Sequence, residues 1–156
     1  MKKILKIKFL FTIAFLLTIT TFFSCKKDDN PTTSINNPST VINIVNSGTW
    51  RITYYFDTDH EETSSFNGYN FSFGSGNILT ASNGTNTYTG SWNVTDSNSN
   101  DDNLSDLDFV IAFNSPLQFL EISDDWEIIE KTQNSIKLRD VSGGNGGTDY
   151  LTFTKN

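Results

Sequence analysis

The sequence predicts an all-β fold, an eight-stranded up-and-down antiparallel barrel. Two observations predict it: from Gly48 onward apolar and polar residues alternate with a period of two, and clusters of Gly, Asn and Ser separate the alternating runs. No long helical periodicity accompanies them. Eight antiparallel strands between residues 48 and 156 must close on themselves or stack as two sheets, because open sheet edges invite aggregation. The near-even spacing favours the barrel, and a β-sandwich is the alternative.

The strands are read from eight alternating runs. In the first, "GTWRITYYFD", Trp50, Ile52, Tyr54 and Phe56 share one face. The later runs are "NFSFGS", "NILTAS", "NTYTGSWNVTD", "LDFVIAF", "DWEIIEK", "SIKLRDV" and "DYLTFTK". In six of them the residues predicted to share a face are Phe71 and Phe73; Tyr88, Gly90, Trp92 and Val94; Leu107, Phe109, Ile111 and Phe113; Trp126 and Ile128; Ile136, Leu138 and Val141; and Leu151 and Phe153.

One segment, "NSPLQFLEISDDW", does not alternate. Pro116 can begin a helix at its first turn, so a short helix is expected within residues 116–124. Leu117, Phe119 and Leu120 would then cover an end of the fold.

The N-terminus has the pattern of a secretory signal peptide. Four lysines at positions 2, 3, 6 and 8 precede an apolar run over residues 9–23, which ends at Ser24. A bilayer-spanning helix needs roughly 20 apolar residues, so a retained transmembrane anchor is the less favoured alternative. Residues 1–24 are therefore expected to be cleaved.

Cys25 is the single cysteine of the chain, and it follows Ser24 directly. The residues before it resemble the lipobox of bacterial lipoproteins, with Phe22 in place of the usual Leu. The resemblance implies that Cys25 is lipidated, with acyl chains of the palmitate kind, and that a membrane is a partner through this lipid anchor. Stable anchoring takes more than one chain. A free or buried cysteine is the alternative.

The charged residues after Cys25 bear on location. Lys27-Asp28-Asp29 resembles the signal that in Bacteroidetes lipoproteins directs the protein to the outer face of the outer membrane. The alternatives are a periplasm-facing protein and a tether kept solvated by charge. Residues 25–47 are rich in Asn, Ser and Thr, which predicts a lipidated N-terminus and flexible tether whose final "VINIV" docks or pairs as a strand.

The net charge excludes one class of partner. The formal charge is −7 for the whole chain and becomes −11 once residues 1–24 are removed, because they hold four lysines and no acid. An acidic protein is repelled by phosphates, so nucleic-acid binding is not expected.

The triplet Gly48-Thr49-Trp50 opens the first strand. It resembles the Gly-x-Trp of lipocalins, and the resemblance to the lipocalin-like domain of Bacteroidetes-type lipoproteins covers residues 48–155. It implies that Trp50 closes the narrow end of the barrel and that a late-strand arginine, here Arg139, packs across it. The chain departs from typical lipocalins in three ways: it ends directly after its last strand, it can form no disulfide, and its Thr-Asp-Tyr at 148–150 opens the final strand rather than lying where lipocalins carry a similar triplet.

The aromatic residues pose the question of a cavity. An eight-stranded barrel is just wide enough to be filled by side chains or to hold one small ligand. Both interpretations stay open here. If a pocket exists, its candidate lining is Trp50, Tyr54, Tyr88, Trp92 and Trp126.

Other motifs carry little chemistry. The single histidine, His60, lies in the acidic run "DTDHEET", and a catalytic metal site would want several ligands from different strands. The loop at 96–106 repeats Asp and Asn every second residue but lacks the Gly and Glu of a calcium loop, which leaves weak calcium binding as an alternative. "SGGNGGTD" is predicted to be a hairpin loop. We expect no catalytic residue, no resident metal or cofactor, and no enzyme activity.

These patterns predict a membrane-anchored lipoprotein with a lipocalin-like barrel at residues 48–156 that binds a small apolar ligand. The alternative is a non-enzymatic surface interaction module with a solid barrel. Its loops at 57–68, 96–106 and 142–148 would contact a protein or glycan.

Overall fold

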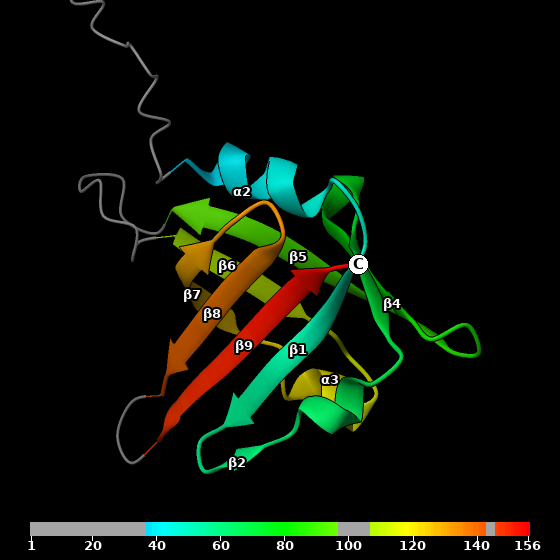
Figure 1. Ribbon diagram of the computed structural model, residues 1–156, viewed down its shortest axis with the longest axis vertical. Coiled ribbons are helices and arrows are strands. Elements are labelled where there is room, and N and C mark those ends of the chain that lie inside the picture. The colour runs from blue at the N-terminus through cyan, green and yellow to red at the C-terminus, as the bar shows by residue number, and fades with distance from the viewer. Residues whose placement is uncertain (1–36, 97–106, 143–145) are drawn as a thin grey trace, which may run out of the picture. The chain divides into compact units, whose positions relative to one another are not determined.

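The computed structural model describes residues 37–96, 107–142 and 146–156. Within these residues the strands form one antiparallel sheet that closes into a barrel (Figure 1). The barrel order is β1-β3-β4-β5-β6-β7-β8-β9, and β9 pairs with β1 to complete the ring. Neighbours in the ring are successive strands of the chain, apart from the short β2. The predicted all-β, eight-stranded up-and-down barrel is therefore confirmed.

The elements have the following bounds. The strands are β1 (Trp50–Asp57), β2 (His60–Glu61), β3 (Asn70–Phe73), β4 (Ile78–Ser82), β5 (Thr87–Asp96), β6 (Leu107–Ala112), β7 (Asp125–Lys131), β8 (Ser135–Val141) and β9 (Thr148–Lys155). The helices are α2 (Pro38–Val45) and α3 (Leu117–Leu120), and two 3-10 turns are η1 (Thr63–Phe66) and η2 (Ser75–Asn77).

Most of the predicted interior faces are confirmed by burial. Period-two alternation identifies them because one side of a barrel wall is dry and the other is wet. The predicted residues that are buried are Trp50, Ile52, Phe71, Phe73, Trp92, Val94, Leu107, Phe109, Ile111, Phe113, Trp126, Ile128, Ile136, Leu138, Leu151 and Phe153. Val141 is an exception: it lies three residues after Leu138, hence on the other face of β8, and 60 % of its surface is exposed.

A bulge in β1 overturns part of the first prediction. The register between β1 and β9 shifts between Ile52 and Tyr54. A bulge adds one residue to one strand and so reverses the side-chain alternation beyond it. Tyr55 is consequently buried at 1 % exposure, whereas Tyr54 is 39 % exposed and stacks on the half-buried Phe56. The prediction that Tyr54 and Phe56 face the interior is wrong for this reason.

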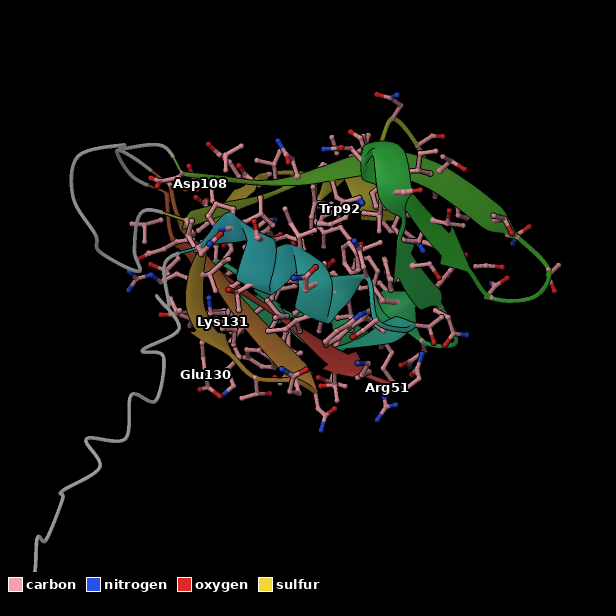
Figure 2. All side chains as sticks on the ribbon, turned by 90° about the horizontal axis from the view of Figure 1, so that it is seen from above. Arg51, Trp92, Asp108, Glu130 and Lys131 are labelled. Carbon is pink, nitrogen blue, oxygen red and sulfur yellow. The ribbon has the colours of Figure 1, made fainter. Side chains whose placement is uncertain are left out.

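Helix α2 replaces the end of the predicted tether. Asn37 caps it, with its side-chain oxygen accepting from the Ser39 backbone N–H at 2.9 Å, and Pro38 occupies the first turn. Val41 and Val45 are buried, so the segment docks, but as a helix rather than a strand. Seen from above, α2 lies across one end of the barrel (Figure 2).

The short helix expected within 116–124 is present as α3. Phe119 is fully buried, whereas Leu117 is 71 % exposed and Leu120 is 42 % exposed. Phe119 alone of the three predicted residues is therefore buried in the core. Figure 1 shows α3 at the end of the barrel opposite α2.

Candidate functional site

The structure separates the five predicted lining residues. Trp50, Trp92 and Trp126 are buried at 5 % exposure or less. Tyr88 is partly buried and packs against the core, and Tyr54 lies on the outside of the barrel. Tyr54 therefore cannot line an interior pocket in this conformation. Ligand binding by the other four stays a prediction.

One group of aromatic rings fills the middle of the barrel around Phe73. Its ring centroid lies 5.4 Å from each of the rings of Trp92, Phe109 and Phe153. All three contacts are edge-to-face, the geometry that aromatic pairs favour. Trp92 also donates its indole N–H to the Gly74 carbonyl oxygen at 3.1 Å. These rings come from β3, β5, β6 and β9, so they join opposite walls of the barrel.

A second group surrounds Phe119. Its ring centroid lies 4.9 Å from Phe113, 5.1 Å from Tyr69, 5.2 Å from Tyr88 and 5.7 Å from Phe66. The Tyr88 ring therefore packs against the Phe119 ring of the core.

The sequence prediction missed Phe66 and Tyr69, which belong to this second group. Both lie in "TSSFNGYN", the connection between β2 and β3, where no period-two pattern marks them. Their large apolar rings in a segment with turn residues were the available signal.

The end under α2 is closed around Trp50. Its indole N–H donates to the Val45 carbonyl oxygen at 2.9 Å, which joins the first strand to the end of the helix. The Lys155 ammonium lies 5.5 Å from the centre of the indole ring. The resemblance to lipocalins implied Arg139 at this place. Instead Arg139 lies on β8 and donates to Glu127 at 3.0 Å, so that prediction is corrected to Lys155.

The opposite end is closed by Tyr55. Its hydroxyl donates to the Glu121 carbonyl oxygen at 2.9 Å, just beyond α3. Burial raises the pKa of Tyr55 well above its ordinary range, and the charges of Asp57, Asp149, Glu121 and Glu62 raise it further. The hydroxyl therefore stays protonated and remains a donor.

Two surface loops meet beside this end. The Thr58 backbone N–H and hydroxyl both donate to one Asp149 carboxylate oxygen, at 2.7 and 3.1 Å. This contact ties the β1–β2 turn to the start of β9. The two predicted contact loops at 57–68 and 142–148 therefore lie together, while residues 97–106 of the third fall outside the described residues, as does the centre of the glycine-rich loop at 143–145.

His60 is held between two acidic side chains. Its ring nitrogens lie 2.6 Å from Asp59 and 2.7 Å from Glu62, and all three groups lie at the surface. These hydrogen bonds raise the pKa of His60, with Asp59 contributing most. Among the described residues, no group of three or more His, Cys, Asp or Glu side chains could hold a metal ion. The arrangement favours a local brace of the turn.

Two predictions, weak calcium binding at 96–106 and the lipid anchor at Cys25, fall mostly on residues that the structure does not describe. Cys25 and the signal segment precede residue 37, and the loop at 96–106 is described only at Asp96. In the described ranges, no helix is long and apolar enough to cross a membrane.

Comparisons with known proteins give one similar structure. No protein-family model matches the chain, and no curated protein matches it. A crystal structure of a DUF4847 family protein from Bacteroides vulgatus ATCC 8482 is similar at 16 % sequence identity with a TM-score of 0.47. The similarity covers 74 % of this chain and 97 % of that chain. A likeness of this degree does not indicate a ligand or an activity.

Proposed function

We propose that the chain is a membrane-anchored lipoprotein whose lipocalin-like barrel is a solid, non-enzymatic interaction module. The observation that carries the proposal is the aromatic packing of the interior. The Phe73 group joins opposite walls of the barrel, the Phe119 group packs at its α3 end, and α2 and α3 cover its two ends. A binding partner would then contact the outer surface of the barrel.

Binding of a small apolar ligand inside the barrel ranks second. Such a ligand needs a lined cavity, typically a few hundred cubic ångströms. Here Trp50, Trp92 and Trp126 have ring or backbone partners at contact distance, so a ligand would have to displace packed side chains. Displacing a well-packed aromatic residue costs several kcal/mol, about as much as binding would gain.

The lipid anchor rests on the sequence. The basic and apolar segment before Ser24, followed at once by the single cysteine, supports lipidation of Cys25. Lys27-Asp28-Asp29 supports display on the cell surface over a periplasm-facing location.

A titration with an apolar fluorescent probe, N-phenyl-1-naphthylamine, tests the solid barrel. The probe brightens when it enters an apolar cavity. We expect no saturable one-site increase in fluorescence with the folded protein. A stoichiometric increase that Trp92→Ala or Tyr88→Ala alters would favour the ligand-binding function instead.

Membrane fractionation tests the anchor. Cys25→Ala should release the protein into the soluble fraction, whereas the control Ser24→Ala, which keeps a small residue before the cysteine, should stay with the membranes. Replacing Lys27-Asp28-Asp29 by alanines should keep attachment and abolish cleavage by protease added to whole cells. A Cys25→Ala protein that still sediments with membranes would overturn the anchor.

A further inference from the structure

The side chains that point outward from β1, β9, β8 and β7 form an ordered pattern, and we call this part of the surface the outer face. Strand register places its residues in two lateral rows. The first row is Tyr54, Thr152, Lys137 and Glu130, in that order across the four strands. The residues in a row are direct cross-strand neighbours, so their side chains lie within contact range of one another.

The second row follows the same plan. It consists of Phe56, Tyr150, Arg139 and Glu127. In both rows an aromatic ring stands on β1, a cation on β8 and a carboxylate on β7. The pattern is therefore repeated along the strands rather than confined to one position.

Two bulges align the first row. The register shifts between Ile52 and Tyr54 in β1 and again between Ile128 and Glu130 in β7. Both shifts immediately precede the row. Each skips one residue in the register, Thr53 in β1 or Ile129 in β7, and so turns the next residue, Tyr54 or Glu130, to the outside. Bulges re-aim side chains and often lie beside functional sites. Figure 2 shows Glu130 on the outside of the barrel, away from α2.

The aromatic part of this face holds two parallel rings with a third beside them. The rings of Tyr54 and Phe56 are 6.4 Å apart and inclined by only 10°, and Tyr150 lies beside Phe56 on the next strand. Tyr54 and Tyr150 are 39 % and 36 % exposed. The electron-rich faces of such rings attract C–H groups with partial positive charge, which the flat faces of sugar rings provide.

The polar part of this face is charge-balanced. Lys137 pairs with Glu130 at 2.8 Å, and Arg139 pairs with Glu127 at 3.0 Å, with all four side chains partly exposed. Each pair offers both donors and acceptors, which suits hydroxyl groups because they donate and accept.

The balance of formal charge also distinguishes the outer face from the rest of the surface. The described residues hold five Lys and Arg against thirteen Asp and Glu, a formal charge of −8, whereas the two ion pairs sum to zero. A polyanion would meet two neutralised cations, and a basic segment would meet two neutralised carboxylates. The charge pattern therefore complements an uncharged, hydroxyl-rich ligand.

We propose that the outer face binds a neutral oligosaccharide chain, which stacks on Tyr54, Phe56 and Tyr150 and donates hydroxyl hydrogen bonds to the carboxylates of the two ion pairs. This inference rests on the proposed function and names the class of partner. It differs from the sequence prediction in placing contact on the strands rather than on the loops.

Calorimetric titration of the full chain, purified in a detergent without a sugar headgroup, tests the proposal. The probes are maltohexaose, cellohexaose, xylohexaose and chitohexaose. We expect at least one to bind, and Tyr54→Ala and Tyr150→Ala each to weaken the binding by about two- to tenfold, the loss of one aromatic contact. Tyr54→Phe and Tyr150→Phe, which keep the ring, should retain stacking.

Ile78→Ala is the matched control, because Ile78 is a 52 % exposed apolar residue on β4, away from this face. It should leave the affinity unchanged. Absence of binding by all four sugars up to about 10 mM, where binding would be weaker than any useful affinity, overturns the proposal. So does equal weakening by Ile78→Ala, or binding confined to heparin or polylysine. Failure here leaves the solid interior standing, because the apolar probe measures that separately.

Discussion

Tyr54 and Tyr55 are neighbours in the chain, yet the first stands outside the barrel wall and the second points into the core. Tyr55 is 1 % exposed and Tyr54 is 39 % exposed. The bulge between Ile52 and Tyr54 produces this division, since it decides which of two identical side chains is buried.

The pair makes a direct test of the bulge. Tyr55→Ala should lower the free energy of unfolding by about 3–5 kcal/mol, the usual cost of removing a buried aromatic ring. Tyr54→Ala should change it by less than about 1 kcal/mol, as expected for a surface position. Urea unfolding measures both. A larger effect at Tyr54 than at Tyr55 would place the register shift elsewhere.

Phe119 is predicted to be the residue on which the α3 end of the barrel depends most. Five other aromatic rings lie within about 6 Å of it, so Phe119→Ala should destabilise the fold by about 3–5 kcal/mol. Leu117→Ala, two residues away in the same helix and 71 % exposed, should change stability by about 0.5 kcal/mol or less. If the two variants unfold at the same urea concentration, Phe119 does not close this end.

Lys155, rather than Arg139, is expected to stabilise the Trp50 end. Lys155→Gln should cost about 0.5–1 kcal/mol through loss of the cation–π contact, and Trp50→Phe about 1–3 kcal/mol because the Val45 carbonyl loses its donor. Lys155→Gln should lower the free energy of unfolding by less in the Trp50→Phe background than in the unchanged protein. Arg139→Gln should show no such coupling to Trp50. Coupling between them would mean that Arg139 packs across Trp50, as the lipocalin resemblance implied.

The brace around His60 predicts a pH dependence. Because its pKa is raised in the folded protein, protonated His60 contributes stability that is fully present below the unfolded value of 6.5 and is lost as pH rises through the folded pKa. NMR titration of the ring protons should show a pKa above 6.5. Glu62→Gln should lower it, whereas Glu61→Gln, which removes a neighbouring carboxylate not bonded to the ring, should lower it less.

The strands were predictable because the barrel wall has one dry face and one wet face, which the sequence records as alternation. The bulge in β1 was not, since "TYYF" offers two adjacent tyrosines and either could be buried. Its consequence was the wrong assignment of Tyr54 to the candidate lining.

Helix α2 was missed for a different reason. Its residues "PSTVINIV" have weak helix propensity, and the segment forms a helix because Val41, Ile44 and Val45 pack on the core. The available signals were Asn37 followed by Pro38 and the spacing of the three apolar residues. Lys155 over Trp50 could not be foreseen either, because it depends on how the two ends of the chain meet.

Native mass spectrometry of the protein purified from its own host tests the solid interior of the barrel most directly. A barrel filled by its own aromatic side chains should give the mass of the lipidated polypeptide alone, with no non-covalent ligand retained under gentle conditions. The contradicting result is a bound apolar molecule of defined mass, present at one copy per chain and lost on unfolding. It would show that the barrel holds a ligand and is not filled by its own side chains.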